Sequence, residues 1–276
     1  MSAGLAHEHA TRTHIRSLVG AAHLGPSLAV TILAGLLAAA QGLGPGHGSL
    51  LVAAVLAGQL SIGWSNDLID AARDRRAGRA DKPLATSTDS GAVGVVRIAC
   101  VVAVAACVVL SLALGPTAGL INLGCVAAAW AYNLGLKATV WSWVPYAVSF
   151  GGLTAFVTWA DGVSPPWWWP VGAALLGVGA HLLNVLPDLD DDAATGVRGL
   201  PHRLGPRRIA PVAAAVLVAA SAVVLVGAAP PLAVTLVAAA VVLGLTVLVV
   251  TGSGRWPFLA AVAVALVDTT LLVVAR

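Results

Sequence analysis

Long apolar segments separated by short polar stretches dominate the sequence. A helix needs about 20 predominantly apolar residues to cross the hydrocarbon core of a membrane, and nine segments reach or approach that length. Turn sequences such as Pro230-Pro231 separate several of them. The predicted spans cover residues 17–41, 50–69, 91–114, 117–136, 140–160, 167–187, 209–229, 232–251 and 256–274. The pattern therefore predicts an all-α integral membrane protein with about nine transmembrane helices.

The composition excludes an ordinary soluble domain. Of the 276 residues, 59% are hydrophobic and only 10% are charged, whereas a soluble domain carries about 25% charged residues. The polar interruptions are short, so we expect one polytopic membrane domain over residues 1–276. It would comprise a cytoplasmic tail (1–16) and a helical bundle (17–274), with acid-rich loops near 66–90 and 184–208.

Lys and Arg residues fall in alternate loops, which predicts the orientation of the chain. The loops after spans 2, 4, 6 and 8 are basic, while the opposite loops hold no Lys or Arg before Arg276. Basic loops stay in the cytoplasm. We therefore expect the N-terminus and both acid-rich loops to be cytoplasmic, in a bacterial cell membrane. This distribution also accounts for the pI near 9.1, and we expect no nucleic-acid partner.

Two acid-rich segments, residues 64–85 and 184–205, share one pattern. At an offset of 118 residues, five residues coincide: Asn66 with Asn184, Asp70 with Asp188, Asp74 with Asp192, Gly78 with Gly196, and Pro83 with Pro201. We infer an internal duplication in which each copy ends a span and enters a cytoplasmic loop.

The spacing within each copy predicts a stripe of acids. Residues at i, i+4 and i+8 lie on one face of a helix, so each copy places an Asn and two Asp in a row at the membrane boundary. Carboxylates repel one another unless a cation neutralises them, so replacing one by Asn should leave stability unchanged or slightly higher. Mg²⁺ is held by carboxylates together with substrate phosphates. The pattern predicts Mg²⁺ on either side of a diphosphate; the alternative is a pair of solvated acidic loops.

At these residues the sequence resembles the UbiA superfamily of intramembrane prenyltransferases. The family motif N-D-x-x-D-x-x-x-D after the second helix matches residues 66–74, and its D-x-x-x-D after the sixth helix matches residues 188–192. Tyr132 and Lys137 match a Tyr and a Lys at the end of the fourth span. The resemblance implies nine helices around a central cavity that opens to lipid. It also implies Mg²⁺-dependent ionisation of a polyprenyl diphosphate and transfer of the prenyl group to a small aromatic or quinone-precursor acceptor.

Residue pattern and resemblance together suggest roles for individual side chains. One Mg²⁺ is expected on Asp67, Asp70 and Asp74, and another on Asp188 and Asp192. The expected diphosphate contacts are Asn66, Arg75, Arg79, Lys82, Lys137, Asn184, Arg198 and Arg203. The expected catalytic residues are Asp67, Asp70, Asp188, Tyr132 and Lys137. His181 either packs between helices or contacts the acceptor, as a binding group or as a proton acceptor. Trp64, Tyr132 and Tyr146 are expected to line an apolar, aromatic cavity below the metal site.

Three functions remain open on the sequence alone. The leading hypothesis is the prenyltransferase. A membrane terpene cyclase of the same superfamily would ionise the same diphosphate but capture the cation within the prenyl chain, without an acceptor. A transporter with inverted repeats would place its ion site at the membrane midplane, whereas these acids lie at the cytoplasmic edge, so we favour it least.

Overall fold

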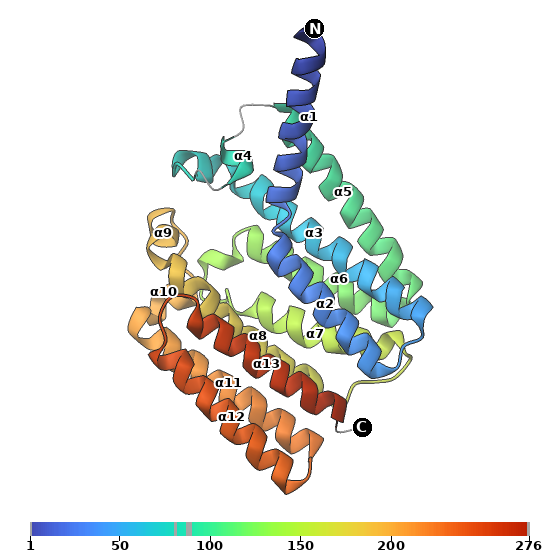
Figure 1. Ribbon diagram of the computed structural model, residues 1–276, viewed down its shortest axis with the longest axis vertical. Coiled ribbons are helices and arrows are strands. Elements are labelled where there is room, and N and C mark those ends of the chain that lie inside the picture. The colour runs from blue at the N-terminus through green and yellow to red at the C-terminus, as the bar shows by residue number, and fades with distance from the viewer. Residues whose placement is uncertain (1, 80–81, 87–89, 275–276) are drawn as a thin grey trace.

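The computed structural model describes residues 2–79, 82–86 and 90–274, and within these ranges every regular element is a helix (Figure 1). The helices are α1 (Ser2–Ala21), α2 (Leu24–Gln41), α3 (Pro45–Arg76), α4 (Pro83–Thr86), α5 (Ser90–Ala113), α6 (Pro116–Asn133), η1 (Leu136–Ala138), α7 (Val144–Ala160), α8 (Trp168–Val185), η2 (Leu186–Asp188), α9 (Leu189–Ala194), α10 (Leu200–Leu204), α11 (Pro206–Ala228), α12 (Leu232–Thr251) and α13 (Trp256–Val274).

Each of the nine predicted spans contains a long helix, so the all-α membrane fold is confirmed. Six helices in the described part of the chain are long and apolar enough to cross a membrane: α2, α3, α5, α8 with its continuation, α11 and α12. Two further apolar helical segments, Val144–Ala160 and Trp256–Leu271, are shorter than these six. The number of crossings, nine, therefore stays a prediction.

The first predicted span is divided into two helices at His23. This residue has φ 48° and ψ 52°, a left-handed conformation that ends α1 and starts α2 in a new direction. The predicted N-terminal tail is also helical, because α1 extends over Ser2–Ala21. Figure 1 shows the N-terminal end of α1 projecting away from the remaining helices.

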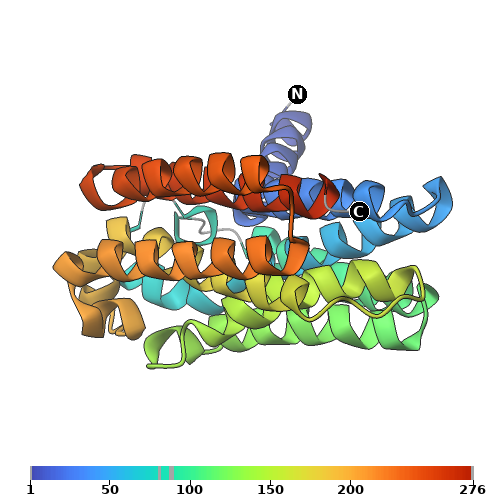
Figure 2. The ribbon, with the colours of Figure 1, turned by 90° about the horizontal axis from the view of Figure 1, so that it is seen from below.

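The duplication seen in the two motifs extends over most of the fold. Adding 118 to the bounds of α2, α3, α5 and α6 gives 142–159, 163–194, 208–231 and 234–251, which are close to α7, α8 with α9, α11 and α12. Corresponding helices also contact each other in corresponding pairs: α2 with α3 as α7 with α8, and α3 with α5 as α8 with α11. Figures 1 and 2 show these long helices side by side, with their axes running broadly together.

The turns after the two acid stripes have the same backbone geometry. Gly78 and Gly196 both adopt positive φ, 68° and 85°, which glycine does without steric cost. The Arg79 N–H donates to the Asp74 carbonyl at 3.0 Å, and the Val197 N–H donates to the Asp192 carbonyl at 2.9 Å. These two hydrogen bonds coincide at the offset of 118 residues, so the repeat is structural.

The two stripes themselves differ, and one expectation was wrong. In the first copy α3 continues to Arg76, so its acids do lie on one helical face. In the second copy α8 ends at Val185, and the 3₁₀ turn Leu186–Asp188 separates it from α9. Pro187 explains the break, because proline has no N–H for the helical ladder and its ring clashes with the preceding turn. Asn184, Asp188 and Asp192 therefore do not form one continuous stripe.

Candidate functional site

Three acids of the first motif are buried near the C-terminal end of α3. The exposed fractions of Asp67, Asp70 and Asp74 are 2%, 6% and 4%. Their spacing of three and four residues places them on one face of the helix. Because desolvating a carboxylate is costly, each of them requires a nearby cation or hydrogen-bond donor.

Asp67 is neutralised from two distant parts of the chain. Its Oδ1 atom accepts from Lys82 Nζ at 2.8 Å and lies 2.8 Å from His23 Nε2, and these two nitrogens are 3.2 Å apart. The other oxygen, Oδ2, is buried and has no hydrogen-bond partner among the described residues. His23 was not among the expected site residues; in the sequence it is only a polar residue that interrupts the first apolar segment.

Asp70 binds two further cations. Its Oδ2 atom accepts from Arg73 Nη2 at 2.7 Å and from Lys137 Nζ, and Arg73 Nε lies 3.7 Å from Asp74 Oδ1. The fold thus brings Lys137, predicted to be a site residue, directly to the first motif. Basic side chains neutralise Asp67 and Asp70, so repulsion between the acids is already relieved, and the expectation that an Asn substitution leaves stability unchanged or slightly higher stays a prediction that these ion pairs argue against.

The second motif is more open than the first. Asn184 and Asp188 are exposed and Asp192 is half-buried. Asp192 lies close enough to Arg73 and Lys137 to interact with both electrostatically. These are the same two cations that hold Asp70, so they link the motifs. Figure 1 shows α4, α9 and α10 at one end of the bundle, where both motifs lie.

A cluster of Tyr and His side chains lies beside the acids. The ring centroid of Tyr146 is 5.5 Å from that of Tyr132 and 4.6 Å from that of His181. The Tyr146 side chain also lies close enough to the side chains of Tyr132 and Asn184 to interact with both electrostatically. Tyr132 interacts electrostatically with Asp70 and Asp192. The cluster therefore joins the predicted acceptor residue, His181, to the acids.

The aromatic wall predicted from sequence is only partly correct. Tyr132 and Tyr146 are together, but Trp64 is not with them. Its Nε1 donates to the Leu18 carbonyl at 2.9 Å, and its ring packs in a separate buried cluster with residues of α1 and α5 such as Ala21 and Val96. Trp64 thus fixes α1 against α3.

Several other predicted diphosphate contacts are exposed or interact with the backbone. Arg75 Nη2 donates to the Leu84 carbonyl at 3.3 Å, which holds α4 in place. Arg198 and Arg203 are exposed, and the ion pairs found among the described residues do not join either of them to an acid. Asn66 is half-buried on α3. The backbone of Arg79 closes the turn onto Asp74.

Carboxylate oxygens are the type of ligand that Mg²⁺ prefers, although the acids of the described residues are not clustered closely enough to surround an ion by themselves. In the described part of the chain, no three His, Cys, Asp or Glu side chains are grouped closely enough to hold a metal by themselves. Mg²⁺ usually needs only one or two carboxylates, because substrate phosphates and waters complete its coordination. The partnerless Oδ2 of Asp67 and the exposed carboxylate of Asp188 are oxygens of this kind. The donor set therefore fits the ion.

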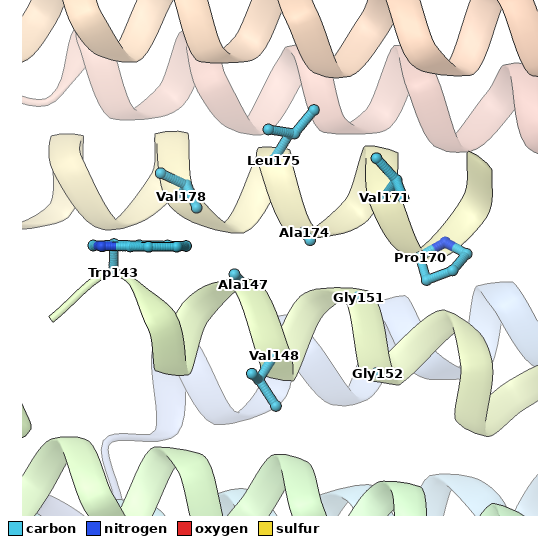
Figure 3. Close-up of a pocket in the computed structure, with 10 residues that line it drawn as sticks. All are labelled: Trp143, Ala147, Val148, Gly151, Gly152, Pro170, Val171, Ala174, Leu175 and Val178. Carbon is cyan, nitrogen blue, oxygen red and sulfur yellow. The ribbon is translucent and has the colours of Figure 1, made fainter. Parts of the chain in front are cut away.

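An apolar groove lies between α7 and α8, on the helices that carry Tyr146 and His181 (Figure 3). Its volume is about 390 Å³, and its ten lining residues include no titratable side chain. Trp143 and Val178 lie toward one end in Figure 3, and Pro170 lies at the other. Such a surface offers dispersion contacts to a hydrocarbon chain and no hydrogen bonds to a diphosphate.

Solved structures of known proteins share this fold. A UbiA homologue from Aeropyrum pernix K1, in its apo form, aligns with a TM-score of 0.74 and 19% identity over 91% of this chain and 98% of that one. A UbiA homologue from Archaeoglobus fulgidus bound to GPP and Mg²⁺ aligns with a TM-score of 0.70 and 15% identity over 95% and 97%. Its complex with DMAPP and Mg²⁺ gives 0.71 and 16% over the same shares. No curated protein sequence matches the chain significantly.

The family follows from the sequence itself. The sequence profile of the UbiA prenyltransferase family matches residues 28–256. The matched region contains both acid-rich motifs, Lys137 and the Tyr–His cluster. The chain belongs to the UbiA prenyltransferase family.

Proposed function

We propose that this protein is a Mg²⁺-dependent intramembrane prenyltransferase that ionises a polyprenyl diphosphate and transfers the prenyl group to a small, aromatic or quinone-precursor acceptor. The observation that carries the proposal is the convergence of both motifs on shared cations. Lys137 and Arg73 bind Asp70 and interact electrostatically with Asp192. A diphosphate at this point would meet ammonium and guanidinium donors together with carboxylates that hold Mg²⁺.

The metal-holding residues would be Asp67, Asp70 and Asp74 in the first copy, with Asp188 and Asp192 in the second. Bound Mg²⁺ would supply positive charge to the diphosphate oxygens as the leaving group gains negative charge. In the structure, Lys82 and Lys137 bind Asp67 and Asp70. As flexible point charges, both ammonium groups can exchange a carboxylate oxygen for a phosphate oxygen when substrate enters.

The Tyr–His cluster would serve the organic half of the reaction. The allylic C–O bond breaks, its electron pair leaves with the diphosphate, and an allylic cation remains. Ring faces attract cations, and Tyr132 and Tyr146 lie beside the acids. A new bond then forms from the acceptor to the allylic carbon, and the proton that the acceptor loses passes to the released diphosphate or to water, which completes the transfer. The apolar groove between α7 and α8 is suited to hydrocarbon.

Three further observations support this assignment. Prenyl diphosphate ligands accompany Mg²⁺ in the Archaeoglobus homologue of the same fold. The acids lie at one end of the bundle, as a substrate with a charged head and a lipid-soluble tail requires (Figure 1). A transporter would place its ion site near the midplane instead. A terpene cyclase would share the acid site, but the polar groups of Tyr132, Tyr146 and Asn184, which lie close together beside the acids, favour an acceptor.

The test is diphosphate release from GPP or DMAPP by the purified protein across a Mg²⁺ titration. Asp70→Asn and Asp188→Asn keep the side-chain size but remove the negative charge that a hard cation requires. We expect each to lower the rate by about 10²-fold or more. Asp161→Asn is the matched control, since Asp161 is exposed at the opposite end of α7; its rate should stay near the wild-type value.

Two outcomes would contradict the proposal. Normal Mg²⁺-dependent release by both motif variants would remove the acids from the mechanism, and normal release in EDTA would remove the metal. Mass spectrometry of lipid products, with and without added acceptors, separates transferase from cyclase. A cyclised hydrocarbon formed without acceptor would favour the cyclase.

A further inference from the structure

Ser142 connects two parts of the candidate site that lie far apart in the sequence. Its Oγ atom accepts from the Leu200 N–H at 3.0 Å and lies 3.0 Å from His181 Nε2. A Cβ atom built on Gly199 would lie 2.5 Å from the Lys137 carbonyl oxygen and 2.8 Å from Ser142 Oγ. The segment leading into α10 is therefore pressed against the turn before α7, and Ser142 is at the contact.

The hydrogen bonds of Ser142 determine where His181 carries its proton. A hydroxyl has one proton to donate, and the Leu200 N–H already occupies one of its acceptor positions. Among the described residues, His181 Nε2 is the partner found for the Ser142 proton. Donation in the other direction would leave the proton of the buried Ser142 hydroxyl without a partner among the described residues, so the network favours donation from Ser142 to Nε2. Burial disfavours a charged imidazolium, and in the neutral ring the proton is then on Nδ1.

The resulting Nδ1–H group is buried beside the acids without a partner. His181 is 1% exposed, and its Nδ1 has no hydrogen-bond partner among the described residues. An unsatisfied buried donor is costly and rare in native proteins. The neighbouring Tyr132 and Tyr146 are half-buried and Asn184 is exposed, so the cluster is open on the side of the second motif.

A second histidine with unused hydrogen-bonding capacity is close by. His202 on α10 interacts electrostatically with His181 and with Asp192. Both of its ring nitrogens are buried and lack a partner among the described residues. A hydroxyl group can accept one hydrogen bond and donate another, so it can satisfy a donor on one imidazole and an acceptor on the other.

We propose that His181, with its tautomer fixed by Ser142, is a positioning residue that donates its Nδ1–H to a hydroxyl oxygen of the second substrate. This inference rests on the proposed function and specifies the hydroxyl-bearing class of acceptor. It also decides between two roles for His181. An imidazole that already carries its proton on Nδ1, and accepts from Ser142 at Nε2, has no lone pair free to take a proton from substrate.

The test compares two aromatic probes that differ only in a hydroxyl group, 2-naphthol and naphthalene. Dissociation constants are measured for protein in nanodiscs and corrected for partition into empty nanodiscs. One added hydrogen bond corresponds to about fivefold to tenfold in affinity. We expect the wild type to prefer 2-naphthol by about that factor, His181→Phe to abolish the preference, and His181→Asn, which retains an N–H donor, to restore part of it.

Ser142→Ala tests the tautomer separately. It removes the donor to Nε2, so both neutral tautomers become available and the preference should fall without vanishing. Ser221→Ala, a buried serine that donates instead to Asp268 on α13, is the matched control and should keep the preference. A purely structural role for His181 predicts equal losses in affinity for both probes and a lower unfolding temperature.

The same preparations are assayed for Mg²⁺-dependent diphosphate release, which keeps the two proposals distinguishable. Normal release in wild type and Ser221→Ala, together with a hydroxyl preference that His181→Phe loses and Ser221→Ala keeps, supports the inference. Normal release with no hydroxyl preference in wild type, or with the preference intact in His181→Phe, overturns it. Failure of release in wild type overturns the proposed function instead.

Discussion

At the scale of single residues, the buried acids of α3 are held by cations from other parts of the fold. The Asp70–Lys137 pair joins residues 67 positions apart, and their side chains are 8% and 10% exposed. Breaking a buried ion pair from one side leaves a charge without its partner, which is strongly destabilising. Charge removal at this site should therefore lower stability, whereas mutual repulsion of the acids would have predicted the opposite sign.

We predict that Lys137→Met lowers the free energy of unfolding by about 1–3 kcal/mol, because Asp70 then keeps only Arg73. Asp70→Asn should cost a similar amount, since Lys137 then lacks a carboxylate. The double variant should lose less free energy of unfolding than the two single variants together, by about 1 kcal/mol or more. The measurement is unfolding in detergent without Mg²⁺. The control combines Lys137→Met with Asp161→Asn, at the opposite end of α7, and the losses of these two should add. If the losses of Lys137→Met and Asp70→Asn also add, the two residues are not coupled.

The site was predictable from the sequence where it rests on spacing and motif. Asp67, Asp70, Lys137 and Tyr132 were all expected near one another, and the structure brings them together. The partners His23, Arg73, Ser142 and His202 were missed. Arg73 lies three residues after Asp70 on α3, so helical spacing could have indicated this pair. The contacts of the other three depend on how the chain around His23, α8 and α10 packs against α3 and the turn before α7, and no periodicity in the sequence encodes that packing.

At the scale of helices and turns, apolar length predicted the helices well because lipid-facing backbone must satisfy its own hydrogen bonds. The breaks were less predictable. His23 ends α1 in a left-handed conformation that β-branched residues avoid, and one polar residue in an apolar run does not by itself predict such a break. Pro187 was visible in the sequence, but the offset of 118 residues suggested a continuous helix. There the local chemistry of proline outweighs the symmetry of the repeat.

We predict that Gly196→Ala lowers the free energy of unfolding by about 1–2 kcal/mol, because an L-residue is strained at positive φ. Gly196 has φ 85° and closes the turn that returns from Asp192. Gly124→Ala is the control: Gly124 lies inside α6 with open space where a Cβ would go, so alanine should be neutral or slightly stabilising there. Equal unfolding temperatures for the two variants would show that this turn is not strained by a side chain.

At the scale of the whole molecule, duplication explains why two similar motifs meet at one end. The unit α2–α6 recurs as α7–α12 with the same contacts between consecutive long helices. The first acid segment lies at the C-terminal end of α3 and the second directly continues α8, the second long helix of each unit, so the fold places them at the same end of the bundle (Figure 1). The sequence revealed this repeat only through the polar residues, because Ala, Val and Leu substitute freely for one another in lipid.

The charge pattern also predicts which side of the membrane the acid-bearing end of the bundle faces. Basic residues gather where α3 ends and α11 begins, and positive charge stays cytoplasmic. Single cysteines at Ala77 and Ala194, exposed near the acids, should react with a membrane-impermeant maleimide only in inverted vesicles. Cysteines at Gly46 and Val163, exposed at the opposite end, should react only in intact cells. The native Cys100, Cys107 and Cys125 are buried and should contribute little background. The reverse pattern would place the diphosphate site outside, and labelling of Ala77 and Ala194 from opposite faces would contradict the shared site itself.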